Sequence, residues 1–131
     1  MNRAVIECYE EAYRILKDME SYCSDKILIV EGVRDREALK ALGLNINIMI
    51  LKNGDSFESM LERLEDVDEI VVLTDFDPQG VELAYKIMNR LESVGVKVNL
   101  TYWSKLRNLL KREIKDVEGL KKLLEILPFT G

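Results

Sequence analysis

The stretch EIVVLTDFDP at residues 69–78 combines a buried strand, a pair of acids and the start of a helix. Residues 69–74 are mostly apolar and β-branched, which is typical of a strand covered on both faces. Asp75 and Asp77 follow, and Pro78 suits the first helical position, where no amide donor is needed. The stretch therefore predicts a strand whose carboxyl end carries two acids.

A second strand with an acid at its end lies earlier in the chain. Residues 26–31 read KILIVE, so this predicted strand ends at Glu31. A helical pattern over 34–42 and another strand pattern over 46–51 come next. Strands separated by helices in this way form a parallel sheet, whose ligands bind at the carboxyl ends of strands beside the switch point. We therefore expect Glu31 to lie near the acids at 75 and 77.

The rest of the chain completes an α/β pattern. The remaining predicted elements are a helix over 3–22, a helix after a capping box at Asp55 and Glu58, a helix from 78 to about 93, an edge strand over 97–102 and two short helices over 104–127. We predict a single α/β domain over 1–131: three α/β/α layers around a four-stranded, mainly parallel sheet, with an extra N-terminal helix and a helical C-terminal tail.

Composition indicates where in the cell the protein is expected and which catalytic groups and metals it can use. No apolar run approaches the roughly 20 residues needed to span a bilayer, so a cytoplasmic protein without a membrane segment is expected. If one helix carries Cys8 and Cys23, they lie about 22 Å apart and cannot form a disulfide, which fits a reducing compartment. The chain has no histidine, which excludes Ser-His-Asp hydrolysis and histidine-containing zinc sites. A metal ion would then be hard and bound through oxygen, with Mg²⁺ or Mn²⁺ ahead of zinc.

The predicted acids at the strand ends favour such a metal. Three neighbouring carboxylates repel one another, and a divalent cation would offset their charge. Asp75 and Asp77 would be its ligands, with Glu31 near the reacting atom. In the alternative interpretation Asp77 merely caps the next helix, Asp75 is a turn residue and Glu31 lies in solvent.

These motifs together resemble a Toprim domain. The resemblance spans roughly residues 25–103 and rests on ILIVEGVRD at 27–35, KNG at 52–54 and VVLTDFDPQG at 71–80. Toprim domains occur in topoisomerases, bacterial-type primases, recombination proteins and nucleases. Within that family the chain is most similar to the small primase-like group that includes the maturation endonuclease of the smallest ribosomal RNA, of the ribonuclease M-five type.

The resemblance implies a role for several of these residues. It makes Glu31 the general acid or base and also places it at the metal that Asp75 and Asp77 hold. Gly32 and Gly80 would allow the backbone to approach a phosphate, because a side chain there would crowd it.

Three further positions have two interpretations each. Asp35 matches an acidic position of the family, but it can equally be a first-turn helix acid. Asn53 and Gly54 would present amides to a phosphate or simply turn the chain.

Charge is unevenly distributed along the chain. The net charge is −5, but residues 103–122 hold seven Lys or Arg against three Asp or Glu, so this segment carries +4 and the remainder −9. Lys105, Arg107 and Lys111 beside Trp103 would follow a phosphate backbone while the indole stacks on a base. Alternatively, Trp103 packs on the sheet and the basic side chains lie in solvent.

The function expected from the sequence is magnesium-dependent cleavage or processing of RNA, with RNA rather than DNA resting on the resemblance alone. Rejoining of nucleic-acid strands and primer synthesis, the other activities of Toprim proteins, need further domains, so hydrolysis is the simpler expectation. The second hypothesis is a metal-dependent nucleic-acid or ribonucleoprotein binding module that works with a partner protein. A haloacid dehalogenase phosphatase fits less well, because its nucleophilic aspartate is normally on the first strand. A phosphorelay receiver also fits less well, because that fold needs two acids after the first strand, one aspartate after the third and a lysine later.

Overall fold

A four-stranded parallel sheet forms the centre of the protein. The computed structural model describes residues 2–51 and 57–127. The strands follow the order β2-β1-β3-β4 and every neighbouring pair is parallel. Their bounds are β1 Ile27–Val30, β2 Asn47–Ile50, β3 Glu69–Val72 and β4 Lys97–Asn99. The predicted α/β class and parallel sheet are confirmed.

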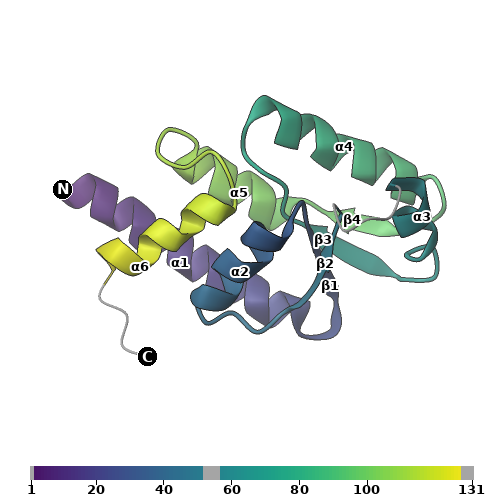
Figure 1. Ribbon diagram of the computed structural model, residues 1–131, viewed down its shortest axis with the longest axis horizontal. Coiled ribbons are helices and arrows are strands. Elements are labelled where there is room, and N and C mark those ends of the chain that lie inside the picture. The colour runs from purple at the N-terminus through teal and green to yellow at the C-terminus, as the bar shows by residue number, and fades with distance from the viewer. Residues whose placement is uncertain (1, 52–56, 128–131) are drawn as a thin grey trace.

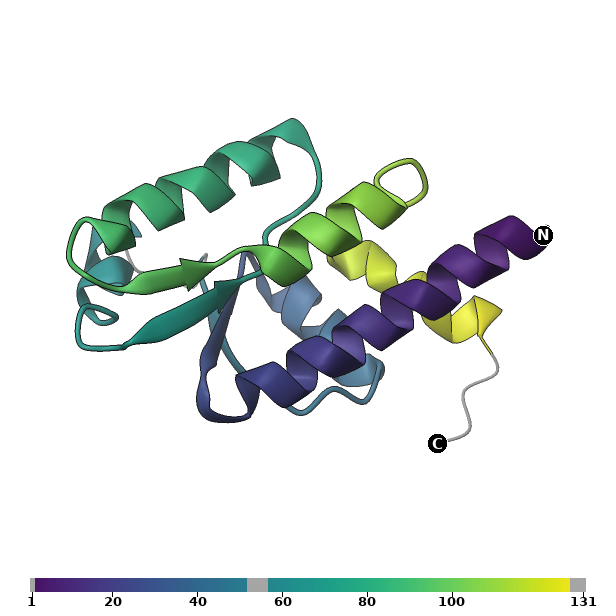
Figure 2. The same ribbon diagram turned by 180° about the vertical axis from the view of Figure 1, so that it is seen from behind.

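Helices connect the strands and cover both faces of the sheet (Figure 1). Right-handed crossovers place α2 on one face and α3 with α4 on the other. The long helix α1 runs diagonally past the sheet, with α5 beside it, as Figure 2 shows from behind. The helices are α1 Arg3–Tyr22, α2 Val33–Ala41, α3 Phe57–Glu62, α4 Pro78–Glu92, α5 Thr101–Leu110 and α6 Leu123–Ile126, with short 3-10 helices η1 Cys23–Asp25 and η2 Glu118–Lys122.

The core is built on the two central strands. Leu28, Ile29 and Val30 of β1 are fully buried, and so are the residues of β3 from Ile70 to Val72. Helix α1 adds an apolar face with helical spacing: Tyr9, Ala12, Leu16 and Met19. Two central strands covered on both sides fix the sheet and therefore the position of their carboxyl ends.

Two boundaries in the second half of the chain differ from prediction. The edge strand predicted over 97–102 ends at Asn99, because the Asn99 side chain accepts a 2.8 Å hydrogen bond from the Thr101 amide and α5 begins there. The last predicted helix divides into η2 and α6. Gly43, which follows the end of α2, has a left-handed backbone (φ +82°), a conformation in which helices commonly end.

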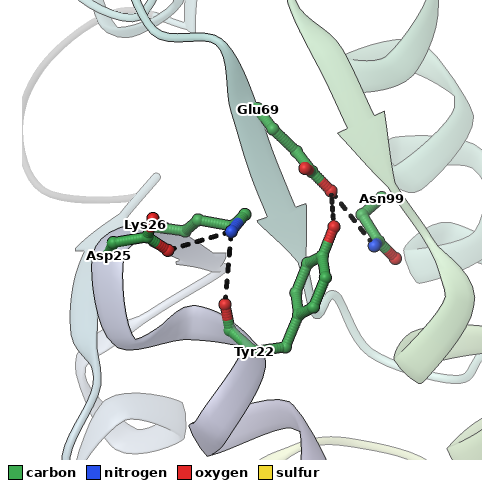
Figure 3. A network of polar contacts seen from close by, with 5 residues as sticks. All are labelled: Tyr22, Asp25, Lys26, Glu69 and Asn99. Carbon is green, nitrogen blue, oxygen red and sulfur yellow. Dashed lines mark hydrogen bonds and ion pairs between the residues drawn. The ribbon is translucent and has the colours of Figure 1, made fainter.

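A polar network fastens the end of α1 to the sheet (Figure 3). The Tyr22 hydroxyl donates a 2.5 Å hydrogen bond to Oε2 of Glu69, the first residue of β3, and Nδ2 of Asn99 donates to the same oxygen at 3.2 Å. Lys26 Nζ pairs with Asp25 and lies 4.4 Å from the centre of the Tyr22 ring. These contacts lie near the start of β3, away from its carboxyl end.

Cys8 and Cys23 are both free thiols, and burial raises the pKa of Cys23 to about 11. Among the described residues, no helix has the length and apolar character needed to cross a membrane.

Candidate metal and nucleic-acid site

Glu31 and Asp75 meet at the carboxyl ends of the two central strands. Glu31 follows β1 and is 9% exposed, and its Oε2 accepts a 2.8 Å hydrogen bond from the backbone amide of Asp75. Because β1 and β3 are neighbours whose connections leave in opposite directions, this is the switch point of the sheet. The structure therefore brings these two predicted site residues together.

Asp35 lies beside them in the first turn of α2. It is 8% exposed, and it accepts hydrogen bonds from the amides of Gly32 at 3.0 Å and Glu118 at 3.1 Å. Burial raises the pKa of Asp35, and the charges of Glu31 and Asp116 act in the same direction. Asp35 is thus a first-turn helix acid and also a neighbour of the other carboxylates, so the two interpretations are compatible.

Asp77 has a structural role at the start of α4. Its Oδ1 accepts a 2.7 Å hydrogen bond from the Gly80 amide, which makes it the N-cap of the helix, and Pro78 occupies the first helical position. Within residues 2–51 and 57–127, Oδ2 of Asp77 has no hydrogen-bond partner. The capping interpretation is therefore correct, and one oxygen remains for another ligand.

Asp75 is the most perturbed acid of the site. Desolvation raises its pKa to about 7, and the negative charges of Glu31, Asp35 and Asp116 add to the increase. A hydrogen bond from the Val117 amide to Oδ1, at 2.9 Å, opposes it. A carboxyl group surrounded by like charges in a partly dry position gains from a nearby cation.

Sequence reasoning missed Asp116 and the amide of Val117. Both come from the segment before η2, which was predicted as part of a separate helical tail. The Phe76 amide donates to the Lys115 carbonyl at 2.8 Å, so this segment lies directly against the loop between β3 and α4. No local signal in the sequence indicates such a contact, because it joins residues about 40 positions apart.

The glycines differ in what surrounds them. A Cβ at Gly80 would collide with the carbonyl group of Asp75, so this glycine serves the packing of the chain on itself. At Gly32 a Cβ would have only Oδ2 of Asp35 within 4 Å, at 3.9 Å, so a side chain could be accommodated there. Asn53 and Gly54 lie outside the described residues.

Of the three basic residues predicted to bind phosphate, Arg107 contacts the same loop. Nε of Arg107 donates to the Phe76 carbonyl at 3.1 Å, while Lys105 and Lys111 are exposed. Trp103 is 3% exposed and its indole nitrogen lies 3.4 Å from the Asp75 carbonyl oxygen. The packing interpretation of Trp103 is confirmed, and a buried indole cannot stack on a base.

Comparison with known proteins identifies the family. The family model described as Toprim domain matches residues 26–118. The chain belongs to the Toprim domain family. The match extends beyond residue 103, so this Toprim domain includes α5 and the segment that contacts Asp75. Toprim domains are found in nucleases, primases and topoisomerases, and the fold is one of metal-binding proteins that process nucleic acid.

Archaeal relatives and a solved structure agree with this assignment. A UPF0292 protein of Thermococcus kodakarensis is 41% identical over 93 residues, which are 71% of this Toprim protein and 69% of the relative. A UPF0292 protein of Methanosarcina barkeri is 37% identical over 114 residues, 85% of this chain and 78% of the relative. The structure of a putative protein from Aquifex aeolicus superposes with a TM-score of 0.67 at 25% identity, covering 81% of this chain and 94% of that one.

The acids of this Toprim domain suit a hard divalent cation in their chemistry. They offer carboxylate oxygens at a partly buried position, the donors that Mg²⁺ and Mn²⁺ prefer. Oδ2 of Asp75, like that of Asp77, has no hydrogen-bond partner in the part of the chain that the structure describes. In that same part, no three acidic or cysteine side chains are already gathered as a metal cage.

Proposed function

We propose that this Toprim domain cleaves or processes RNA by magnesium-dependent phosphodiester hydrolysis. Asp75 and Asp77 would hold the metal, with Glu31 beside it as the general acid or base. The observation that supports the proposal most is the 2.8 Å hydrogen bond from the Asp75 amide to Glu31, because it joins the predicted proton-transfer group to the predicted metal ligand at the switch point. The family supplies the substrate class, nucleic acid.

The protein side chains contribute positioning and proton transfer. Mg²⁺ or Mn²⁺, when bound, supplies positive charge that offsets the charge developing on the phosphate. Glu31 is held at its Oε2 by the Asp75 amide, so its carboxylate has a fixed direction at the strand end. In hydrolysis Glu31 takes the proton of the attacking water and returns it to the oxygen of the leaving nucleotide.

The basic side of the site is proposed to bind the phosphate backbone. The Arg107 side chain donates a hydrogen bond to the carbonyl of Phe76, and Phe76 lies in the loop that carries both aspartates. Lys111 and Lys115 continue the positive charge from there and are exposed, with Lys115 Nζ bonded to the Lys111 carbonyl. The RNA would then approach from the α5 side, where an otherwise acidic protein carries positive charge.

A second candidate function is metal-dependent RNA or ribonucleoprotein binding without turnover, with activity in a partner protein. The specific observation in its favour is that Asp77 already caps α4 and that the described residues contain no assembled group of three acids. Such a module would hold a phosphate through the metal and still lack hydrolysis.

One assay separates the two functions. Purified protein is incubated with a structured RNA and Mg²⁺ or Mn²⁺, beside Glu31→Gln, Asp75→Asn and, as a matched control on the exposed tail, Glu125→Gln. Hydrolysis predicts discrete products with wild type and Glu125→Gln, and none with the other two variants. Metal-dependent RNA association that persists in Glu31→Gln, without products from wild type, identifies the binding module. Cleavage by Asp75→Asn at the wild-type rate contradicts both proposals.

A further inference from the structure

Consecutive amides of the segment before and within η2 bind three different acids. The Val117 amide donates to Oδ1 of Asp75 at 2.9 Å, and the Glu118 amide donates to Oδ1 of Asp35 at 3.1 Å. The next amide, that of Gly119, donates to Oδ1 of Asp116 at 2.7 Å. We call residues 115–119 the tail turn.

One side-chain hydrogen bond and one backbone hydrogen bond hold the tail turn in shape. The hydrogen bond between Asp116 and the Gly119 amide closes it, and the Leu120 amide bonds to the Val117 carbonyl at 3.0 Å. A Cβ at Gly119 would lie 2.9 Å from both Oδ1 of Asp116 and Cγ2 of Ile114. A larger residue at 119 would therefore force the turn to shift.

Asp35 and Asp75 come from different elements, and the tail turn binds both. Asp35 belongs to α2, which packs on η2, and Asp75 belongs to the loop after β3. Each uses Oδ1 for an amide of the tail turn, which fixes the rotation of the carboxyl group. The direction of the second oxygen of Asp75 then depends on a segment more than 40 residues away.

We propose that the tail turn positions the carboxylates of Asp75 and Asp35 for the reaction, with Asp116 and Gly119 as positioning residues. The inference rests on the proposed function, since it concerns the same acids. It gives the C-terminal segment a role within the site rather than beside it. Asp116 acts through the turn that it closes, and its oxygen matters as a hydrogen-bond acceptor rather than as a charge.

The contrast between Asp116→Asn and Asp116→Ala tests this role. Asparagine keeps an oxygen that can accept from Gly119, whereas alanine removes it. We expect amide hydrogen exchange at Val117 and Glu118 to accelerate about tenfold in Asp116→Ala, as loss of a side-chain cap does, and to stay within about threefold of wild type in Asp116→Asn. Glu125→Ala, an exposed change on the same tail, is the control.

The functional readout separates positioning from a direct role. With RNA and Mn²⁺, Asp116→Ala should lose about tenfold in kcat with little change in KM, and Asp116→Asn should restore kcat. Gly119→Ala should behave like Asp116→Ala without removing any charge. An equal loss in Asp116→Asn would show that the charge itself acts, and unchanged exchange and kcat in Asp116→Ala would also overturn the inference.

Failure of the proposed function leaves a different pattern. If wild type binds Mn²⁺ but does not cleave RNA, the affinity for Mn²⁺ replaces kcat as the readout, with the same order of variants expected. If wild type takes up no Mn²⁺, the proposed function fails while the exchange data still show whether Asp116 closes the turn. Fast exchange of Val117 and Glu118 in the wild type itself would overturn the positioning role directly.

Discussion

The backbone amide of Asp75 donates a 2.8 Å hydrogen bond to Oε2 of Glu31, and this contact joins the ends of the two central strands. It ties the proposed general base to the backbone of the proposed metal ligand. The Glu31 side chain is buried, so losing its acceptor oxygen would leave the Asp75 amide without this partner. The residue therefore has a structural role as well as the proposed chemical one.

Glu31→Gln separates these two roles. Glutamine keeps an oxygen that can accept from Asp75, so thermal unfolding should stay within a few degrees of wild type. Loss of the general base should lower the RNA cleavage rate by about 10² to 10⁴. Glu31→Ala should lose cleavage and also about 1–3 kcal/mol of stability. Wild-type cleavage by Glu31→Gln would show that another group moves the proton.

Gly80→Ala and Gly32→Ala form a matched pair. The Cβ at position 80 meets the Asp75 carbonyl group, so overpacking should cost about 1–3 kcal/mol and displace the loop. At position 32 the space is open, and the melting temperature should barely change. If a phosphate lies over Gly32, RNA affinity should fall in that variant although its fold is intact. Equal melting temperatures for the two variants would contradict the described packing.

The fold follows from local patterns in the sequence. The apolar runs at β1 and β3 and the acids after them are local signals, and they predict both the sheet and the meeting of Glu31 with Asp75. Strand β4 ends earlier than its sequence pattern predicts, because the Thr101 amide donates a hydrogen bond to the Asn99 side chain where α5 begins. Alternating polarity alone does not reveal such a side-chain hydrogen bond.

The contacts of the tail turn lie beyond what one sequence shows. Asp116 looks like one charge in a solvated basic segment, yet its charge reaches Asp35 and Asp75 in the folded chain. Asp77 is a different case, since its pattern predicts both a cap and a ligand, and the cap is present in the structure. Long-range packing determines which carboxylate oxygens accept hydrogen bonds from backbone amides.

The contribution of Asp75 to the stability of the metal-free protein should fall as the pH rises from about 4 to 7. The pKa of Asp75 is about 7 in the folded state, above its ordinary value of 3.8, so the folded state binds this proton more tightly than the unfolded state. This contribution is fully present below pH 3.8 and is lost as the pH passes through about 7. Melting curves in EDTA across this pH range should show the wild-type protein losing stability relative to Asp75→Asn. A slope unaffected by Asp75→Asn would contradict the assignment.

Tyr22→Phe should weaken the attachment of α1 to the sheet without affecting the site. The change removes the hydroxyl that donates to Glu69 (Figure 3), and a hydrogen bond to a partly buried carboxylate contributes about 1–2 kcal/mol. Tyr85→Phe is the control, because Tyr85 is 47% exposed. Chemical denaturation should show a loss only for Tyr22→Phe, and Mn²⁺ affinity should be unchanged in both variants.

Replacing both Lys111 and Lys115 by glutamine should weaken binding to RNA of any sequence. The slope of the logarithm of the binding constant against the logarithm of the salt concentration should also fall, by the equivalent of about two phosphate contacts. Fluorescence anisotropy at several salt concentrations measures both quantities. Lys40→Gln, on the exposed surface of α2, is the control for loss of charge. An unchanged salt slope in the double variant would place the RNA backbone elsewhere on the protein.

Calorimetric titration of Mn²⁺ into the wild-type protein and Asp75→Asn tests the proposed metal site most directly. We predict uptake of a divalent ion by wild type, with affinity at least tenfold weaker in Asp75→Asn and tighter at pH 8 than at pH 6, because the carboxyl group must lose its proton to bind. No uptake by the wild-type protein, or equal affinity in both proteins, would contradict the assignment of the strand-end acids as a metal site.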